Sequence, residues 1–401
     1  MRSNYKKIWD LIHLVDERNK GLHVSLLLWL TIAKKFIPSV ANTIWTDMEN
    51  YKIIRKNQFA CSLMQVRRDK KMPVALVQEF NEAIISQAYP VFEVNDEKEL
   101  LPEYLMMWFS RSEFDREACF YAVGGVRGSL EWEDFGNMQL PIPDITKQQE
   151  IVDEYNTIKD RISLNNDLIG KLEETAQAVY RERFVDFEFP FDFVKDKPDE
   201  NGNSYKSSGG EMEYCEELEK EVPKGWKMDE LKNVIENFDS KRKPMSWDER
   251  ENMEKKYPYY WAASLMDYVE NYIFDWEYIL LWEDGTVVQN DWTPVLQYVW
   301  WKFWVNNHAH VLKWVDWYDE NTLYLLLRNT NIQDIITWWV QAKINQWNLN
   351  SIRFLKPSEE LLKYFKNTIY PMFSYFKKKT DENIALNKLL FIILSKMASE
   401  R

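Results

Sequence analysis

The chain has 401 residues, a formal net charge of −13 and three cysteines, and hydrophobic residues make up 45% of it. This length suffices for two domains that each bury a core, and three cysteines without a CxxC pair exclude a disulfide-dense secreted scaffold. The start MRSNYKKIWDLIHL lacks the apolar stretch of a secretory signal, and no apolar run reaches the length of a membrane span, so we expect a cytoplasmic protein.

Residues 1–143 mix short β-rich runs with one helical stretch. The runs VALVQEF and AIISQAYPVFEV are rich in apolar and β-branched residues, as strands are. A helix is expected over residues 102–114. The mixture predicts an α+β domain that is closed by Pro141 and Pro143.

Residues 144–186 carry side chains alternately four and three positions apart, the spacing of a coiled-coil seam. The seam positions are Ile151, Tyr155, Ile158, Ile162, Asn165, Ile169, Leu172, Ala176 and Val179. They predict a helix of roughly 40 residues, which is about 60 Å long at 1.5 Å per residue.

Residues 187–224 are expected to form an acidic linker. Residues 186–221 hold twelve acidic side chains against four lysines, a net charge of −8, and include the polar run NGNSYKSSGG. DNA binding needs a basic surface. Because most of the negative charge is concentrated in this segment, the net charge of −13 does not exclude DNA binding by the rest of the chain.

Residues 225–356 are predicted to form a second α+β domain, which opens with PKGWKMDELKNVIENF much as YKKIWDLIHLV opens the first. Its expected strands are YVENYIF, YILL, FWVNNHAHVL and TLYLLL, which alternate with turn signals.

The chain contains a tandem duplication. Residues 124–143 align without a gap on residues 338–357, so the numbering of the two copies differs by 338 minus 124, which is 214. This offset places a second seam within residues 357–401, at Phe365, Ile369, Met372, Phe376, Lys379, Asn383, Leu386, Leu390 and Ile393. We expect the two helices to pair as an antiparallel coiled coil, with the polar residues Asn165 and Lys379 fixing its register. The alternative is two separate helices, each packed on its own domain.

Tryptophan and glycine usage is anomalous, with 19 Trp and 11 Gly. Trp stands at many positions where a turn favours glycine, as in NDWTP and LLWEDG. The positions that fit this pattern are Trp9, Trp29, Trp45, Trp261, Trp276, Trp282, Trp292, Trp301, Trp314, Trp317, Trp338, Trp339 and Trp347. We hypothesise that these are UGA codons that encode glycine. The alternative is a Trp-rich surface that stacks on bases or sugars.

Three runs carry a resemblance to a known family: KRKPMSWDER, YPYYWAASLMDYVENYIFDWEYILLWEDG and LPIPDITKQQEIVDEYNTIKDRI. The first two look like the target recognition domain of the specificity subunit of type I restriction-modification systems, and the third looks like its central conserved helix. The chain resembles this subunit over essentially its whole length. The departures are the Trp residues where the family has Gly.

The resemblance implies two target recognition domains, residues 1–143 and 225–356, separated by a central conserved helix (144–186), an acidic linker (187–224) and a distal conserved helix (357–401). Each domain would read one half of a bipartite site in double-stranded DNA, with the paired helices setting the spacer. The implied partners are methyltransferase subunits, which bind S-adenosylmethionine, and restriction subunits, which need ATP and Mg. No cofactor or metal is expected on this chain.

Basic and polar side chains near the aligned segments are candidate DNA contacts, since Arg suits guanine edges, Gln suits adenine and Lys suits phosphates. The candidates are Arg67, Arg68, Lys70, Lys71, Arg127, Lys241, Arg242, Lys243, Asn306, Asn307, His308, Gln341 and Lys343. Solvated charged turns are the alternative for both basic clusters. His308 and His310 have ligand-like spacing but no evident third ligand, so a metal site is not favoured.

Catalytic signatures are missing from the sequence. It has no GxxxxGK[ST] loop and no Asn/Asp-Pro-Pro-Tyr/Phe signature of amine methylation. We therefore expect a non-catalytic subunit. The competing hypotheses are a metal-dependent nuclease using Glu283, Asp284 and His308, and a coiled-coil scaffold that does not bind DNA.

Overall fold

The computed structural model describes residues 4–40, 46–123, 128–262, 264–315, 319–338 and 341–398. They divide into two compact units, residues 1–165 with 381–401 (unit 1) and residues 166–380 (unit 2). The fold mixes helices with sheets in each unit, and each of two long helices contributes one end to each unit. No helix among the described residues has both the length and the apolarity to cross a membrane.

Unit 1 is built on a four-stranded antiparallel sheet in the order β2-β9-β6-β7. Its strands are β2 (Ile12–Val15), β9 (Val91–Val94), β6 (Phe59–Cys61) and β7 (Val74–Leu76). Three further antiparallel pairs of strands complete the unit: β1 (Tyr5–Lys7) with β10 (Gln139–Pro141), β3 (Leu28–Leu30) with β4 (Phe36–Pro38), and β5 (Lys52–Arg55) with β8 (Glu82–Ile85). The unit also contains four short helices: α1 (Val66–Asp69), α2 (Pro102–Phe109), α3 (Ser112–Tyr121) and α4 (Trp132–Asn137).

Unit 2 repeats this arrangement with a sheet in the order β17-β23-β20-β21. Its strands are β17 (Ile235–Asn237), β23 (Ala309–Trp314), β20 (Tyr278–Trp282) and β21 (Leu296–Val299). A second sheet joins β19 (Ser264–Val269), β18 (Tyr257–Trp261) and β22 (Trp304–Val305), and β24 (Thr337–Trp338) pairs with β25 (Ala342–Lys343). Helices α6 (Trp247–Glu251), α7 (Glu320–Arg328) and α8 (Gln346–Asn350) complete this part of the unit.

The duplication extends to matching elements at the predicted offset. Strand β26 (Arg353–Lys356) pairs with β16 (Lys227–Glu230), as β10 pairs with β1. Adding 214 to the first residue of α4, Trp132, gives 346, where α8 begins, and adding 214 to Ile145 gives 359, where the second long helix begins. The tandem repeat is therefore a repeat of structure as well as of sequence.

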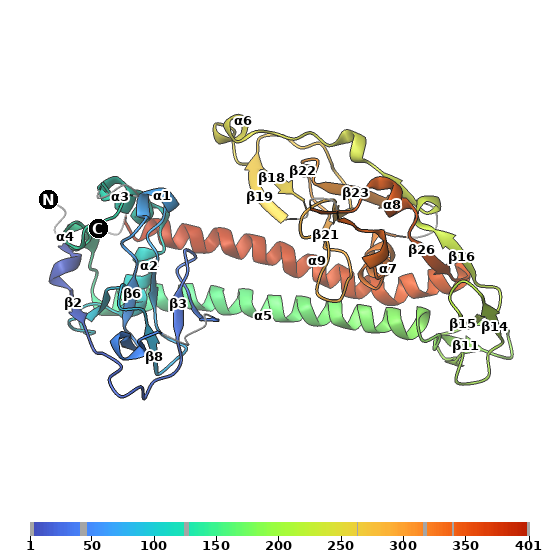
Figure 1. Cartoon of the computed structure of the whole chain (residues 1–401), viewed down its shortest axis with the longest axis horizontal. Helices are drawn as coiled ribbons and strands as arrows, with labels where there is room; N and C mark the ends of the chain where they lie inside the picture. The colour runs from blue at the N-terminus through green and yellow to red at the C-terminus, as the bar shows by residue number, and fades with distance from the viewer. Residues whose placement is uncertain are drawn as a thin grey trace. The chain divides into compact units, whose positions relative to one another are not determined.

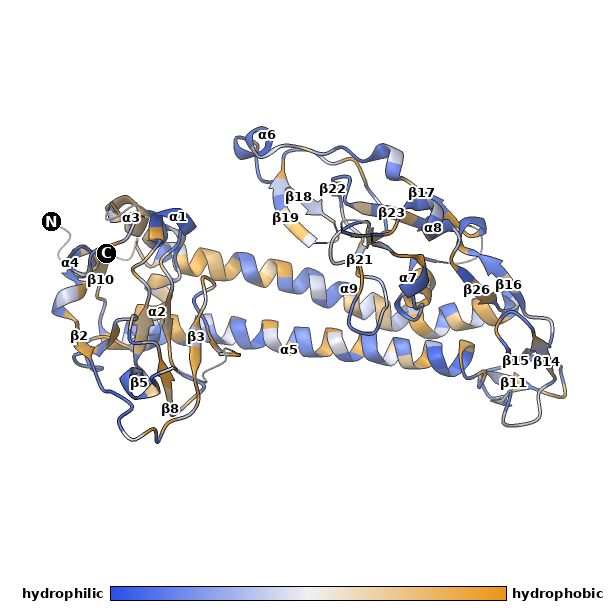
Figure 2. Cartoon of the chain, in the orientation of Figure 1, coloured by the Kyte–Doolittle hydropathy of each residue, from blue (hydrophilic) through white to orange (hydrophobic). Residues whose placement is uncertain are grey.

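The long helices are α5 (Ile145–Phe184) and α9 (Glu359–Lys396), of 40 and 38 residues (Figure 1). In unit 1, Arg161 bonds Glu382 at 2.7 Å, and in unit 2, Arg183 bonds Thr368 at 3.1 Å. Because the numbering falls along α9 as it rises along α5, the pair is antiparallel, as predicted. Hydrophobic and hydrophilic residues alternate along both helices in Figure 2, as an amphipathic seam requires.

Each end of the helix pair is part of the core of the unit that it belongs to. In unit 1, Ile151, Val152 and Met397 join the buried cluster around the β6 and β9 strands. In unit 2, Phe365 packs edge-on against Phe184 with ring centroids 4.7 Å apart. The helices are therefore built into both units and are not separate surface elements.

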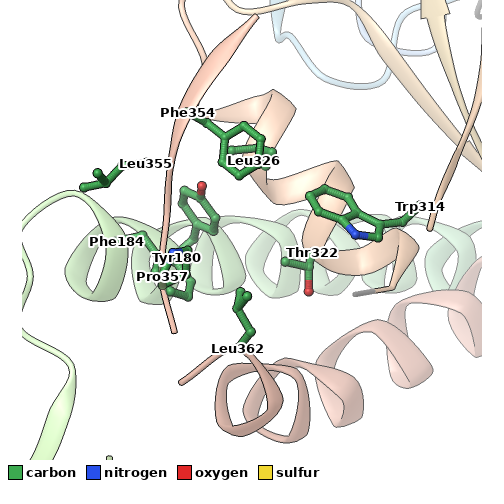
Figure 3. Close-up of a pocket in the computed structure, with 9 residues that line it drawn as sticks. All are labelled: Tyr180, Phe184, Trp314, Thr322, Leu326, Phe354, Leu355, Pro357 and Leu362. Carbon is green, nitrogen blue, oxygen red and sulfur yellow. The ribbon is translucent and has the colours of Figure 1, made fainter. Parts of the chain in front are cut away.

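A small, mostly apolar hollow lies in unit 2 where α5, α7, β26 and α9 meet (Figure 3). Its lining residues are Tyr180, Phe184, Trp314, Thr322, Leu326, Phe354, Leu355, Pro357 and Leu362. Because the Thr322 hydroxyl already donates to Asp319 at 2.8 Å, the lining is typical of core packing and not of a polar ligand site.

The strand expected over YVENYIF ends at Val269, and three larger expectations also differ from the structure. The helix expected over residues 102–114 is two helices, because the chain leaves helical geometry at Arg111, whose φ is −74° and ψ 143°. The run TLYLLL is the helix α7 and not a strand: Asp319 caps it by accepting from the Thr322 amide at 2.9 Å. Its residues from Asn321 to Leu327 are buried on all sides, and a short run of that kind has no period that separates strand from helix.

The third difference is the acidic segment, which is folded and not an open linker. It contains β11 (Pro190–Asp192), β12 (Lys197–Pro198), β13 (Asn203–Ser204), β14 (Met212–Cys215) and β15 (Lys220–Pro223). Phe187 and Phe189 are buried in the core of unit 2, and Phe189 stacks on Tyr205 with centroids 4.5 Å apart. These aromatic residues lie between the acidic residues in the sequence. They give the segment an apolar core, which a count of its charges does not reveal.

Candidate nucleic-acid interface

The basic residues of unit 1 lie on and just after α1, in the connection between β6 and β7. The residues at either end of α1, Gln65 and Lys70, have left-handed backbone with φ of 65° and 53°, so the helix is a single tight turn. The side chains of Arg67, Arg68, Lys70 and Lys71 are at least partly exposed. Arg68 bonds the Asp69 carboxylate at 2.6 Å, which raises the pKa of the Arg68 guanidinium.

The α1 segment is held against the residue that follows Arg127. The Arg67 amide donates to the Gly128 carbonyl at 3.1 Å, and the Leu130 amide donates to the Leu63 carbonyl at 2.9 Å. A Cβ on Gly128 would lie 2.4 Å from the Arg67 Cβ, and Gly128 has a φ of +67°, so glycine is required here. Arg127 itself lies outside the described residues.

A buried ion pair fixes the far end of the basic segment. The Lys34 ammonium bonds the Asp115 carboxylate at 2.8 Å, and the same carboxylate accepts from the Met72 amide, directly after Lys71, at 3.0 Å. Burial is the main cause that lowers the pKa of Lys34. Lys34 and Asp115 therefore position the candidate contacts, and no motif in the sequence singled them out.

Unit 2 makes similar backbone contacts, and one partner of each contact lies at the repeat offset. The Gly285 amide donates to the Ala342 carbonyl at 3.0 Å, and the Ile344 amide donates to the Glu283 carbonyl at 2.8 Å. Ala342 and Ile344 are the repeat equivalents of Gly128 and Leu130, so the connection after β20 docks as the connection after β6 does. The side chains at this shared position differ, because Arg67 in unit 1 corresponds to Gly285 in unit 2.

Three charged residues of unit 2 form a compact network beneath this position. Arg242 donates to the Glu283 carboxylate at 2.7 Å and to the Ala309 carbonyl at 2.6 Å, and its side chain is only 12% exposed. Lys343 bonds the other oxygen of Glu283 at 3.2 Å. Burial alone would raise the pKa of Glu283, but Arg242, His310 and Lys343 hold it below its ordinary value.

The buried His310 connects this network to the segment that carries Lys343. Its Nδ1 lies 2.5 Å from the Asp239 carboxylate, and its Nε2 lies 2.8 Å from the Ile344 carbonyl oxygen. Asp239 also accepts from the Val311 amide at 2.9 Å. Burial opposes ionisation of Asp239, yet the bond from His310 leads the interactions that lower the pKa of Asp239.

Asp239, Glu283 and His310 lie close enough to hold a metal ion, because their ligand atoms are within 4.8 Å of one another. However, the carboxylates face cationic side chains of the protein, and both nitrogens of His310 face oxygen acceptors. This donor set fits an ion-pair network better than a divalent cation.

His308 lies two residues before His310 but points into a different environment. Its Nδ1 bonds both oxygens of Asp284, at 2.8 and 2.9 Å, and the side chain is 27% exposed. The buried Asn306 accepts from the His308 amide at 2.9 Å through Oδ1, and the neighbouring Asn307 is exposed. These residues form a polar turn between β22 and β23, which interrupts the strand expected over FWVNNHAHVL.

The remaining candidates lie at the edges of this site. Gln341 is exposed, and a Cβ on Gly285 would lie 3.2 Å from its amide nitrogen. Lys241 and Lys243 are exposed; the Lys241 ammonium lies 4.7 Å from the Phe238 ring centroid, and the Lys243 carbonyl accepts from the Trp304 indole at 2.6 Å.

The structure thus gathers five of the eight candidates of unit 2 around one network. Arg242, Asn307, His308, Gln341 and Lys343 are linked through Glu283, Asp284 and Gly285. Arg242 forms most of its hydrogen bonds with other groups of the protein. We therefore infer that it holds the other residues of the site in position. Asp239 and Gly285 were not singled out from the sequence; the run LLWEDG contains Gly285, and no signal in the sequence indicated Asp239.

Comparisons with known proteins identify the class. The family model for the type I restriction modification DNA specificity domain matches residues 66–174 and 223–389. The chain therefore belongs to the type I restriction-modification specificity subunits, with one copy of the domain in each half.

Individual relatives agree with this assignment. A Haemophilus influenzae protein named as a specificity subunit of this type is 33% identical over 128 residues, covering 32% of this chain and 31% of the relative. The HindI specificity subunit of the same organism is 30% identical over 107 residues, covering 26% of this chain and 23% of that one. These alignments span less than a third of either relative.

A solved structure shares the fold over nearly the whole chain. The type I restriction-modification S subunit of M. genitalium aligns with a TM-score of 0.53 at 12% identity, covering 99% of this chain and 96% of the other. At this identity the match supports the fold: two domains and two long conserved helices.

Proposed function

We propose that this chain is a non-catalytic DNA-recognition subunit that reads a bipartite site, with unit 1 reading one half and unit 2 the other. The supporting observation is the repeated docking of the β6–β7 and β20–β21 connections onto equivalent segments of the two repeats. The same backbone arrangement carries different side chains in the two units. Such a difference is required if the two half-sites differ in sequence.

The side chains at the two positions suit different bases. Arg67 and Arg127 in unit 1 offer the bidentate donors that match guanine, whereas Gln341 in unit 2 offers an amide that matches adenine. The lysines Lys70, Lys71 and Lys343 are suited to phosphates. The paired helices would act as a ruler between half-sites that are roughly 34 Å, one duplex turn, apart.

The proposed partners follow from this role. Methyltransferase subunits would bind S-adenosylmethionine and modify adenine after flipping it from the duplex, and restriction subunits would use ATP and Mg. The complex would act on DNA in the cytoplasm. This chain would supply the address and none of the chemistry.

The test is to co-express the chain with its methyltransferase subunit and to map modified adenines across the host genome. A two-part motif with a fixed spacer is the expected result. An unmodified genome, with the two subunits soluble and associated, would contradict the proposal.

The competing functions are tested with the purified chain. Duplex binding that weakens steeply with rising salt is expected of a DNA reader, whereas a scaffold would not bind. Cleavage by the chain alone with a divalent cation would favour the nuclease. Against the nuclease, two of its proposed catalytic groups, Asp284 and His308, are bonded to each other, and Glu283 is held by Arg242 and Lys343.

A further inference from the structure

The Asp284–His308 pair has a defined hydrogen-bonding polarity. A carboxylate only accepts hydrogen bonds, so the contacts of 2.8 and 2.9 Å place a hydrogen on Nδ1 of His308. In the neutral ring the second nitrogen, Nε2, is then an acceptor. The structure gives Nε2 no hydrogen-bond partner among the described residues.

The surroundings of His308 place this nitrogen in a polar patch. Asn307 and Lys343, which lie beside the pair, are exposed, and Lys343 forms a β-bridge with Asp284. The His308 ring is thus held on its Nδ1 edge by Asp284, and it is 27% exposed in all.

The His308 backbone is fixed as well. Its amide donates to Asn306, which is fully buried, and its carbonyl accepts from the Glu283 amide at 3.0 Å. Residues 283 and 284 therefore hold His308 through the main chain and the side chain together. Such double support is what a base-reading side chain needs to keep its geometry.

We propose that Nε2 of His308 accepts a hydrogen bond from the exocyclic amino group of a cytosine or an adenine in the half-site read by unit 2, and that Asp284 sets this polarity. In the major groove these amino groups are the donors, whereas guanine and thymine present acceptors. The proposal deepens the proposed function and rests on it.

The experiment uses the complex of the full chain with its methyltransferase subunit. It measures methylation of duplex libraries randomised in one half-site at a time. His308→Ala should lower discrimination at one base pair of the second half-site on the order of tenfold, the range of a direct base contact. The first half-site should be unchanged.

Asp284→Asn tests the polarity directly. An asparagine amide can donate to Nδ1, which moves the hydrogen to Nε2 and makes it a donor. The preference at that base pair should then shift toward guanine or thymine. Because the asparagine Oδ1 can also accept from Nδ1, Asp284→Ala is measured beside it, and an Asp284→Ala complex that keeps the wild-type preference would overturn the role of Asp284.

The matched control is His13→Ala in unit 1, which removes an exposed imidazole that bonds Asn95 and Glu93. It should leave the preference in the second half-site unchanged. His308→Gln retains an acceptor on a side chain of similar reach, and it serves if the alanine variant has a lowered melting temperature.

The outcomes separate the two proposals. If the wild-type complex produces no two-part motif, the proposed function fails. If the wild-type motif is two-part and His308→Ala leaves it unchanged, the inference about His308 fails alone. A uniform loss of affinity for all sequences would mean a phosphate contact and would also overturn it.

Discussion

The Asn165 amide donates from Nδ2 to Oδ1 of Asn383 at 2.9 Å within the antiparallel helix pair. Asn165 is 1% exposed and Asn383 9% exposed, in a seam that is otherwise mostly apolar. A polar pair of this kind favours the one alignment in which both amides are satisfied, at a cost in stability. The sequence pattern predicted a register-fixing role for Asn165 and Lys379, and the structure pairs Asn165 with Asn383, a further polar residue of the seam.

Asn165→Leu should therefore destabilise the chain by about 1–3 kcal/mol, because it removes the partner of the buried Asn383 amide oxygen. The double variant Asn165→Leu/Asn383→Leu should recover to within about 1 kcal/mol of the wild type or exceed it. Urea unfolding of the wild type, both single variants and the double variant measures the coupling. Equal stability of the single variant and the wild type would contradict a structural role for the bond.

Gly128→Ala should disturb the basic segment of unit 1. The added Cβ would lie 2.4 Å from the Arg67 Cβ, and φ at this position is +67°, so a loss of about 1–3 kcal/mol is expected. Gly170→Ala on α5 is the control, since a Cβ there meets nothing within 4 Å and should stabilise the helix by about 1 kcal/mol. Thermal melts of both variants test this contrast.

The sequence predicted the parts of the fold that depend on periodicity and repetition. The seam positions and the repeat offset located both long helices. The prediction was wrong where the local residue pattern does not distinguish a strand from a helix, or a folded segment from a linker. The run TLYLLL is apolar throughout, and the core of the acidic segment depends on Phe187 and Phe189 meeting residues distant in the chain.

The candidate site was predicted as residue types but not as a geometry. Arg242 and Lys343 were expected to face DNA, yet both bond Glu283, which is distant from each of them in the chain and which no spacing connects to them. Gly285 and Asp239 act through tertiary contacts alone. Such contacts depend on the register between β17, β23 and β20, and a single sequence does not specify that register.

The network of Asp239 and Glu283 predicts a loss of stability in acid. Both carboxyls have pKa values lowered in the folded state, so their contribution is present above the ordinary carboxyl range near 4. It is lost as pH falls through the lowered values. The melting temperature should fall in that window, and Glu283→Gln should flatten this dependence while costing about 2 kcal/mol at pH 7. Glu133→Gln, at an exposed position on α4, should leave the profile unchanged.

Substitutions in the two units should affect different halves of the site. Arg127→Ala should change the preference in the first half-site only, and Gln341→Ala in the second only, because each lies in the segment of its own unit. Lys71→Ala should weaken binding to all sequences and reduce the slope of affinity against salt by about one ion. Methylation motifs and binding titrations measure these effects. Unchanged specificity in both halves would remove Arg127 from the candidate contacts.

Trp292 has a φ of 63°, in the left-handed region that favours glycine, and its amide donates to the Gln289 carbonyl at 3.1 Å to close a turn. The nearby Trp282 has a buried indole nitrogen without a hydrogen-bond partner among the described residues. Both observations agree with the hypothesis that these positions are glycine codons read as tryptophan.

Trp292→Gly should therefore raise stability by about 1 kcal/mol, the strain removed from one left-handed residue. Trp226→Gly is the contrasting control: Trp226 is 7% exposed and stacks on Phe189 with centroids 5.6 Å apart, so its loss should cost about 3 kcal/mol or more. The coding DNA gives the second measurement, with UGA expected at position 292 and UGG at position 226. A UGG codon at position 292, together with a loss of stability in Trp292→Gly, would rule the hypothesis out, because the turn would then have evolved around the indole.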